Sequence, residues 1–323
     1  MTQATDPQRA TDTLRDLEQA LNSVLIGQQD VVRQVILALI SGGHVLLEGV
    51  PGLGKTLLVR SLGRCLSLPA ARIQFTADLM PSDVTGHAIY DPKTERFRIR
   101  KGPVFTGLLL ADEINRAPAK TQAALLEVMQ ERQVTIEGNA FALDAPFFVL
   151  ATQNPIDQEG TYPLPEAELD RFLFKVLIDY PDQDSEQKLV REVLDGRISE
   201  QLTVDDLKPL ADRDTLLAVQ QCARELTVDP AVLDYAVRLV RESRDFPGLA
   251  RGAGPRASIA LCRAARAEAL LAGRDFVIPD DIKAVARPVL RHRLCLSADA
   301  EIEGQSMEQL LDRLLDQVAA PRQ

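Results

Sequence analysis

The stretch His44-Val45-Leu46-Leu47-Glu48-Gly49-Val50-Pro51-Gly52-Leu53-Gly54-Lys55-Thr56 decides the fold. It is typical of a short apolar strand followed by a glycine-rich turn, and the next residues, 57–62, continue with helical spacing. A turn of this kind that ends in Gly-Lys-Thr between a strand and a helix predicts a phosphate-binding loop. The alternative is a plain glycine turn with a surface lysine, and the strand, turn and helix together disfavour it.

The residue types of this loop suit phosphate chemistry. Gly49, Gly52 and Gly54 permit backbone conformations that a Cβ would forbid, so successive N–H groups can converge on phosphate oxygens at a helix N-terminus. Lys55 is expected to reach the β- and γ-phosphates, and Thr56 to offer its hydroxyl to Mg²⁺. The predicted nucleotide-binding loop comprises Gly49, Val50, Pro51, Gly52, Leu53, Gly54, Lys55 and Thr56.

Length and composition indicate an ordinary globular chain. Its 323 residues, 46% hydrophobic and 26% charged, make two domains the expectation. The formal net charge of −10 argues against a dedicated DNA-binding protein, although a local basic groove stays possible. We found no secretion signal, no apolar run long enough to cross a bilayer and no C-x-x-C spacing among the four cysteines. The sequence therefore predicts a cytoplasmic protein without membrane insertion.

A second apolar run, residues 107–111, ends in two acids. Such a run is typical of a strand buried on both faces, and Asp112 and Glu113 follow at its carboxyl end, the usual ligand side of a parallel sheet. Asp112 is expected to hold Mg²⁺, directly or through water, and Glu113 to orient and polarise the attacking water. The alternative is an acidic turn after a core strand.

Three further polar residues stand at the ends of predicted elements. Asn154 follows a buried strand at 146–152, where its amide could hydrogen-bond the γ-phosphate and the hydrolytic water, although an Asn-Pro pair alone indicates a turn. Arg171 precedes the predicted strand 172–178, and locally it could equally be a surface residue. Arg256 begins a long predicted helix, where the dipole disfavours a cation, so a functional role or a solvated arginine would explain it.

Two hairpins interrupt the predicted core. Segments 86–90 and 96–100 flank a turn-rich loop and place three arginines, 96, 98 and 100, on one face. That face is either solvated or a working surface for a partner or a central pore. Segments 133–137 and 140–143 are joined by Gly138-Asn139, which we predict to be a two-residue turn.

Strand patterns stop near residue 184, and helix signals continue to the end of the chain. Asp184 with Gln187 resembles a capping box, which predicts a helix start there. A long helix after Gly254 is expected to end at Gly273 and to bury one face, consisting of Ile259, Cys262, Ala265 and Ala269. The expected domains are a nucleotide-binding core at 1–183 and a helical domain at 184–323.

The order of these pieces resembles that of the AAA+ ATPases, and their sequences resemble the MoxR family in particular. The resemblance runs from about Leu17 to the last helix. It is carried by the phosphate-binding loop and by four further segments: Leu110-Ala111-Asp112-Glu113-Ile114-Asn115-Arg116-Ala117, Ala151-Thr152-Gln153-Asn154-Pro155, Leu164-Pro165-Glu166-Ala167-Glu168-Leu169-Asp170-Arg171-Phe172 and Gly254-Pro255-Arg256-Ala257.

The resemblance implies an α/β fold, an αβα sandwich with a five-stranded parallel sheet, followed by an all-helical lid domain. It implies a helix-2 insert at about 80–102 and a hairpin before the sensor strand at about 133–143. It also implies residue roles. Asn154 takes the sensor-1 place, Arg171 the arginine-finger place and Arg256 the sensor-2 place, while Ile26 and Gly27 match the segment that borders the adenine.

The resemblance further implies ATP and Mg²⁺ as cofactors and a homo-oligomeric ring, commonly a hexamer. Family members are thought to act as chaperone-like machines that mature or activate client proteins, often with a von Willebrand factor A domain protein. We therefore expect ATP hydrolysis at a subunit interface. One alternative is a ring motor on DNA, which the acidic net charge disfavours. The other is a nucleotide-gated scaffold without productive hydrolysis, which the presence of both Asp112 and Glu113 disfavours.

Overall fold

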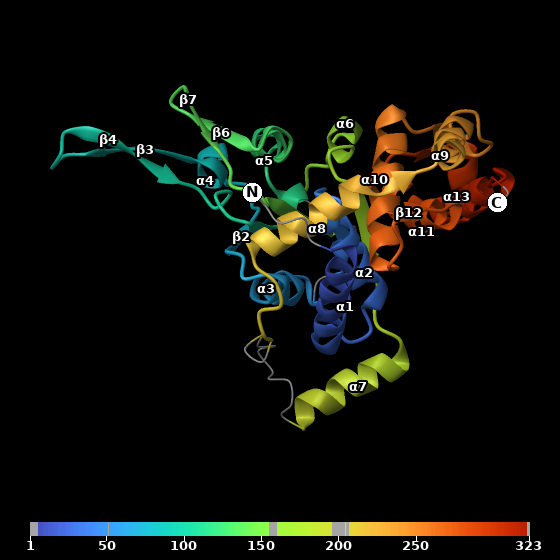
Figure 1. The fold of residues 1–323 in the computed structure, drawn as a ribbon. Coiled ribbons are helices and arrows are strands. Elements are labelled where there is room, and N and C mark those ends of the chain that lie inside the picture. Colours follow the sequence, from blue (N-terminus) through green and yellow to red (C-terminus); the bar gives the residue numbers. More distant parts are fainter. Residues whose placement is uncertain (1–5, 51, 155–159, 196–203, 205–206, 322–323) are drawn as a thin grey trace.

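The computed structural model describes residues 6–50, 52–154, 160–195, 204 and 207–321 (Figure 1). Five parallel strands form the central sheet in the order β2-β5-β8-β1-β9. The five-stranded parallel sheet expected from the sequence is confirmed. Its strands are β1 (Val45–Gly49), β2 (Ala70–Gln74), β5 (Leu108–Asp112), β8 (Phe148–Gln153) and β9 (Phe174–Ile178).

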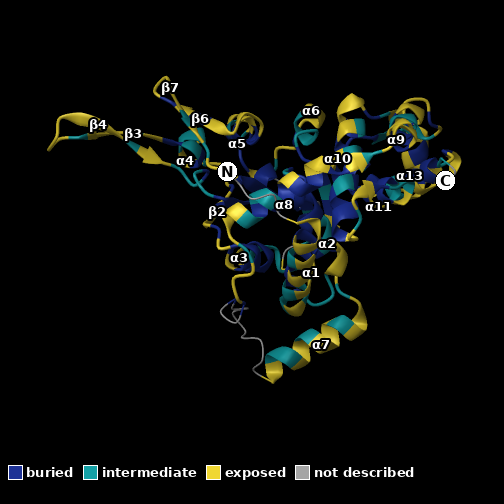
Figure 2. Ribbon diagram, viewed as in Figure 1, coloured by how far each residue is buried: buried dark blue, intermediate teal, exposed yellow. Residues whose placement is uncertain are grey.

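Helices cover both faces of this sheet because successive strand residues point to opposite faces. Val45 and Leu47 belong to one hydrophobic cluster with residues of several helices, whereas Leu46, between them, belongs to a second cluster with Leu125 and Leu126. All three side chains are fully buried, and Figure 2 shows that buried residues gather at the centre of the molecule. The result is the expected αβα sandwich. Its helices are α1 (Pro7–Val24), α2 (Gln29–Ile40), α3 (Lys55–Cys65) and α5 (Ala119–Glu131).

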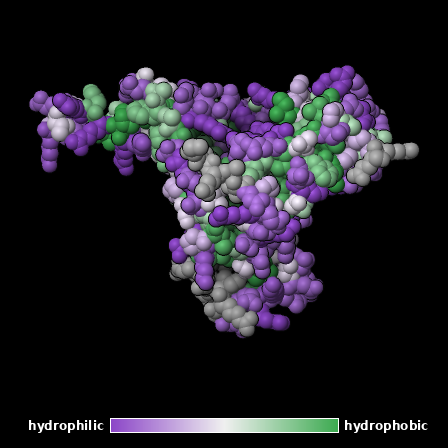
Figure 3. Space-filling view, viewed as in Figure 1, coloured by the Kyte–Doolittle hydropathy of each residue, from purple (hydrophilic) through white to green (hydrophobic). Residues whose placement is uncertain are grey.

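A long hairpin extends away from the body of the molecule, with hydrophobic and hydrophilic side chains along it (Figures 1 and 3). Its cross-strand register pairs Tyr90 with Phe97, and the two rings meet edge to face at 5.5 Å. The opposite face carries the expected arginines, of which Arg98 forms an ion pair with Asp91 at 2.9 Å. The elements are α4 (Pro81–Thr85), β3 (Gly86–Asp91) and β4 (Arg96–Lys101).

The second hairpin consists of β6 (Gln133–Ile136) and β7 (Asn139–Ala142). Asn139 pairs with Ile136, so the turn is Glu137-Gly138, and the predicted turn Gly138-Asn139 is wrong by one residue. Both turn residues have positive φ, +48° for Glu137 and +75° for Gly138. A two-residue turn of this type needs left-handed backbone at both positions, which leaves Asn139 free to pair in the strand.

The remainder of the chain is mainly helical, as expected. It also contains short strands that the sequence did not indicate, paired as β10 with β12 and β11 with β13. The remaining elements are η1 (Ile114–Arg116), α6 (Glu166–Leu169), α7 (Gln183–Leu194), α8 (Arg213–Glu225), β10 (Thr227–Val228), α9 (Pro230–Glu242), β11 (Leu249–Arg251), α10 (Pro255–Leu271), β12 (Phe276–Val277), α11 (Pro279–Leu290), β13 (Cys295–Leu296), α12 (Ala298–Ile302) and α13 (Met307–Gln317).

Two local predictions in this part are wrong. Asp182, not Asp184, caps α7, because its carboxylate accepts a hydrogen bond from the Ser185 backbone N–H at 2.7 Å. Ile259 of α10 is 61% exposed, although it was predicted to be buried. The buried stripe of α10 follows its many alanines, and Ala265 and Ala269 do lie in it as expected.

The N-terminal helices and the C-terminal helices share one hydrophobic cluster. Thr11 Oγ1 of α1 donates to Leu270 O of α10 at 2.9 Å, and Gln220 Nε2 of α8 donates to Leu39 O of α2 at 2.7 Å. The division into domains at 1–183 and 184–323 therefore stays a prediction. Within the described ranges, no helix is long and apolar enough to cross a membrane.

Candidate active site

The phosphate-binding loop joins the end of β1 to the start of α3. At Gly49 the neighbouring strand approaches so closely that a Cβ would lie 2.3 Å from Ile178 O. Gly54 is the N-cap of α3 and has φ +80°, a left-handed conformation that favours glycine. Pro51 lies outside the described residues. Helix α3 therefore presents its N-terminus, with its unpaired N–H groups, at the carboxyl edge of the sheet.

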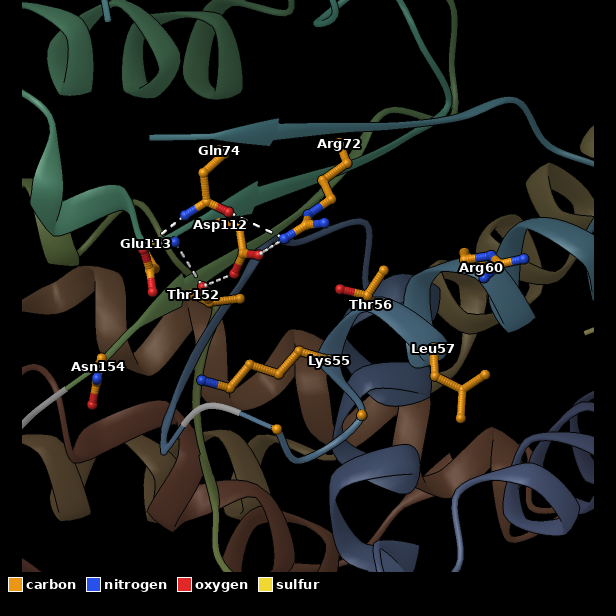
Figure 4. Close-up of a pocket in the computed structure, with 12 residues that line it drawn as sticks. Lys55, Thr56, Leu57, Arg60, Arg72, Gln74, Asp112, Glu113, Thr152 and Asn154 are labelled. Atoms are coloured by element: carbon orange, nitrogen blue, oxygen red, sulfur yellow. Dashed lines mark hydrogen bonds and ion pairs between the residues drawn. The ribbon is translucent and has the colours of Figure 1, made fainter. Parts of the chain in front are cut away.

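A cavity of about 370 Å³ lies at this edge (Figure 4). It brings together most of the residues predicted from the motifs. They come from the loop and the start of α3, from the end of β5 and the residue after it, and from the residue after β8. Gly49, Val50 and Leu53 belong to the loop but do not line the cavity. The lining residues are Gly52, Gly54, Lys55, Thr56, Leu57, Arg60, Arg72, Gln74, Asp112, Glu113, Thr152 and Asn154.

Lys55 is the cation of the loop. Its Nζ donates to Gly49 O at 2.6 Å, so the side chain folds back over the turn toward the cavity. Burial lowers the pKa of Lys55, and the nearby carboxylates of Asp112, Glu113 and Glu48 oppose that shift. A half-buried cation facing two acids is suited to binding an anion together with a metal ion.

The two acids are held by their neighbours at the ends of the strands. Asp112 Oδ1 accepts a hydrogen bond from Thr152 Oγ1 at 2.6 Å, and the same hydroxyl accepts one from the Glu113 backbone N–H at 2.8 Å. Glu113 has φ +55°, which turns the chain sharply after β5. Asn154 follows β8, lines the same cavity and is 8% exposed. β5 and β8 are neighbours in the sheet, so their carboxyl ends place these side chains together.

Ile26 and Gly27 do not line this cavity. Gly27 has φ +78°, and a Cβ there would lie 2.7 Å from Pro181 Cβ, so it packs against the segment that leads into α7. The preceding Leu25 lies behind the loop, where its Cδ2 would be 3.2 Å from a Cβ at Gly54. Their expected position beside the adenine stays a prediction.

Arg171 and Arg256 line a second cavity, of about 320 Å³, and not the first. Arg171 donates to Leu126 O at 3.1 Å and to Gln130 Oε1 at 2.7 Å. Arg256 lies 3.5 Å from Asp170 Oδ2. The structure thus brings the two predicted arginines together but keeps them apart from Lys55. The charged residues of this cavity are Arg132, Asp170, Arg171, Arg256, Arg263 and Arg293.

Asp170 is the single carboxylate among these lining residues, and it is fixed by the buried Arg293. Arg293 Nε donates to Asp170 Oδ1 at 2.7 Å, and its Nη2 donates to Phe172 O at 2.7 Å. Burial lowers the pKa of Arg293, and the ion pair with Asp170 opposes that shift. Arg293 therefore anchors the segment from which Arg171 projects.

Residues 44–174 match the family model described as "ATPase family associated with various cellular activities (AAA)", and residues 241–314 match the AAA lid domain. Chaperone MoxR1 of Mycobacterium tuberculosis is 46% identical over 93% of this chain and 80% of its own length. Protein MoxR of Methylorubrum extorquens is 32% identical over 96% of both chains. The chain belongs to the MoxR family of AAA+ ATPases.

A solved structure supports the fold of this MoxR-family chain. A protein from Cytophaga hutchinsonii, described only as a candidate ATPase, superposes with a TM-score of 0.89. It is 40% identical, and the match covers 98% of this chain and 97% of that one. The uncharacterised protein YeaC of Bacillus subtilis is 44% identical over 94% of this chain and 93% of its own length. The predicted family and fold class are therefore confirmed.

Sequence reasoning missed five lining residues of this MoxR-family site: Leu57, Arg60, Arg72, Gln74 and Thr152. Gln74 ends β2 and lies opposite Asp112 in the sheet register. A signal did exist for Gln74 and Thr152, since polar residues near the carboxyl end of a predicted parallel strand reach the ligand edge. Using it would have required knowing that β2 and β8 both neighbour β5.

Proposed function

We propose that this chain hydrolyses ATP in the first cavity. The observation that carries the proposal is the convergence of Lys55, Thr56, Asp112, Glu113 and Asn154 on one cavity at a helix N-terminus. Together they supply a cation, a hydroxyl, two carboxylates and an amide. Transfer of a phosphoryl group to water relies on positioning and on neutralising charge, and this set can do both.

The residues fit a nucleotide with Mg²⁺. The N-terminus of α3, preceded by Gly54, offers backbone N–H groups and a partial positive charge to phosphate oxygens. Thr56 and Asp112 supply the oxygen atoms that Mg²⁺ prefers. When bound, Mg²⁺ would neutralise phosphate charge, and Lys55 would contribute a second cation.

Glu113 is the proposed water-orienting residue. A carboxylate there can accept a hydrogen bond from the attacking water and so direct the water oxygen toward the phosphorus. The backbone of Glu113 is fixed by Thr152, and its side chain by Gln74 at 2.7 Å and Arg116 at 3.3 Å. The amide of Asn154 can hydrogen-bond the γ-phosphate or the same water.

The two arginines are proposed to act on the nucleotide of a neighbouring subunit. Arg171 and Arg256 lie in the second cavity, so neither faces the Lys55 cavity of its own chain. In a ring of identical copies, which we propose to be a hexamer, the second cavity of one copy would meet the first cavity of the next. A guanidinium there would stabilise charge that develops on the phosphoryl oxygens. Since Arg256 is paired with Asp170 beside Arg171, we assign it to the same interface.

We further propose that hydrolysis drives chaperone-like remodelling, maturation or activation of a client protein, with a von Willebrand factor A domain protein as a candidate partner. The name of one relative, Chaperone MoxR1 of Mycobacterium tuberculosis, supports this role. The projecting hairpin supports it too, because Tyr90 and Phe97 are 51% and 73% exposed at its far end. We place the protein in the cytoplasm and propose no nucleic-acid substrate.

Mixing two inactive variants tests the shared site. Glu113→Gln should bind ATP and hydrolyse it very slowly, and Arg171→Ala should bind ATP without turnover. If the site is shared, mixed rings contain interfaces with an intact Glu113 from one copy and an intact Arg171 from the other. ATPase activity should therefore rise on mixing. Activity that stays at the level of the separate variants, in mixtures shown to co-assemble, would contradict the interface site, and normal turnover in Glu113→Gln would remove Glu113 from the mechanism.

A further inference from the structure

Both carboxylate oxygens of Asp112 have partners from this chain. Thr152 Oγ1 donates to Oδ1 at 2.6 Å, and Arg72 Nη2 donates to Oδ2 at 2.7 Å. The Asp112 side chain is 16% exposed, whereas that of Arg72 is 52% exposed. A charge-assisted contact of this length is among the stronger hydrogen bonds in proteins. Any second cation that approaches Asp112 Oδ2 therefore meets the guanidinium of Arg72.

Arg72 is also connected to Glu113. The same Nη2 donates to Gln74 Oε1 at 3.1 Å, and Gln74 Nε2 donates to Glu113 Oε2 at 2.7 Å (Figure 4). Arg72 and Gln74 are alternate residues of β2 and so point to the same face of the sheet. The amide oxygen faces a cation and the amide nitrogen faces an anion, which fixes the orientation of Gln74. The result is a continuous chain from Asp112 through Arg72 and Gln74 to Glu113.

We propose that Arg72 is a positioning residue that competes with Mg²⁺ for Asp112 Oδ2, and that Gln74 holds its guanidinium in place for that competition. This inference rests on the proposed ATPase function, from which it takes the role of Asp112. A guanidinium and a divalent cation repel each other at contact distance, so only one of them can hold Asp112 Oδ2.

Arg60 provides a matched control within the same cavity. It projects from α3 and lines the same cavity as Arg72, apart from Asp112, so its loss removes the same charge from that cavity (Figure 4). Among the described residues, no carboxylate lies within ion-pair distance of Arg60. Arg60 therefore contributes to the field around a nucleotide without competing for Asp112.

The experiment measures the affinity of the full chain for ADP by calorimetry, across a range of free Mg²⁺ concentrations. ADP avoids turnover, so the measurement reports binding alone. We expect Arg72→Gln and Arg60→Gln both to weaken ADP binding, since each loses one positive charge. We call the Mg²⁺ concentration that gives half of the maximal Mg²⁺ effect on ADP affinity the Mg²⁺ midpoint. In Arg72→Gln alone, this midpoint should be lower than in the wild type, by about three- to tenfold for a partly exposed ion pair. Gln74→Ala, which removes the second acceptor of Arg72, should shift the midpoint less, in the same direction.

The proposal is overturned if the Mg²⁺ midpoint of Arg72→Gln equals that of the wild type, or if Arg60→Gln shifts by the same amount. An unchanged midpoint in Gln74→Ala removes Gln74 from the chain of contacts. Arg72→Lys keeps the cation, so its Mg²⁺ midpoint should stay near that of the wild type. That result would show that Arg72→Gln acts through the loss of charge. If wild-type protein bound ADP without any dependence on Mg²⁺, the proposed nucleotide site itself would be wrong, which is a different result.

Discussion

The two cavities differ most in how their charges are balanced. The first is lined by Lys55, Arg60 and Arg72 together with Asp112 and Glu113, so cations and anions nearly match. The second is lined by five arginines and the single carboxylate of Asp170. In a chain with a net charge of −10, that concentration of unbalanced cations is a local exception.

This difference separates two tasks. A cavity that carries both cations and carboxylates can bind an anion and a metal ion by itself, because it offers groups of opposite sign to each. The second cavity keeps its charges close together only at an electrostatic cost, which a bound anion would remove. Burial and the nearby Arg132 and Arg224 together lower the pKa of Arg263, which reflects that crowding. The proposed anion is the triphosphate held by the first cavity of a neighbouring copy.

The variant Arg171→Ala tests this difference between the two cavities most directly. If the second cavity serves catalysis and not binding, turnover should fall by about 10³- to 10⁵-fold, the range known for arginine fingers. ATP affinity should stay close to that of the wild type. Steady-state ATPase rates and equilibrium nucleotide binding measure the two effects separately. The control is Arg238→Ala, which removes an exposed arginine paired with Asp234 on α9 and should change neither quantity. Wild-type turnover in Arg171→Ala would show that the second cavity does not serve catalysis through Arg171.

Lys55→Ala should produce the opposite pattern. Its Nζ belongs to the first cavity, so nucleotide affinity should fall, by about ten- to a hundredfold for a charge-assisted contact. Titration with a fluorescent ADP analogue measures that loss. Together with Arg171→Ala, this variant separates binding in one cavity from turnover in the other. Equal ATP affinities of Lys55→Ala and the wild type would instead place the nucleotide elsewhere.

The smallest expected effect concerns His44, which lines the second cavity and precedes β1. Its ring is buried, its Nδ1 accepts from the Val149 N–H at 3.1 Å, and burial lowers its pKa to about 4. The pKa of His44 is lower in the folded state than in the unfolded state. The contribution of the neutral ring to stability is therefore complete above about pH 6.5 and is lost as the pH falls toward 4. Between pH 7 and pH 5 we expect the free energy of unfolding to drop by about 2 kcal/mol.

Urea unfolding at several pH values measures this loss. The control is His87→Gln, which removes a histidine that is exposed on β3. The pKa of buried His292 is also lowered by burial and by nearby Arg293, and its protonation should add to the effect in the same direction. Equal stability at pH 7 and pH 5 would show that His44 is not held neutral in the fold.

The sequence predicted the parts of the site that are continuous in the chain. Lys55 and Thr56 follow the glycines of one loop, and Asp112 and Glu113 end one apolar run, so local spacing was enough to find them. Arg72 and Thr152 were missed because their proximity to Asp112 depends on the order β2-β5-β8, which no local pattern encodes. The placement of Arg256 was equally non-local, since its contact with Asp170 joins residues far apart in the sequence.

Smaller errors had local physical causes. The predicted turn was one residue too late. Both Gly138-Asn139 and Glu137-Gly138 contain the glycine that a tight turn favours, and only the strand register distinguishes them. Asp182 and Asp184 are both suitable helix caps, and the start of α7 depends on which carboxylate reaches the Ser185 N–H. Ile259 was assigned to the core by its hydrophobicity, but in an alanine-rich helix the buried face can be the one with the smallest side chains.

The shared hydrophobic cluster of α1, α2, α8 and α10 has a practical consequence for dissecting this protein. A fragment cut at the boundaries of the matched ATPase region, 44–174, would lack α1 and α2, whose buried residues share a cluster with Val45 and Leu47. A lid fragment beginning after residue 183 would likewise expose the side of α10 on which Thr11 rests. Either piece would present bare apolar surface to water and should aggregate when expressed alone. Because α1 packs against both α3 and α10, any rocking of the C-terminal helices would have to disturb the packing of α1.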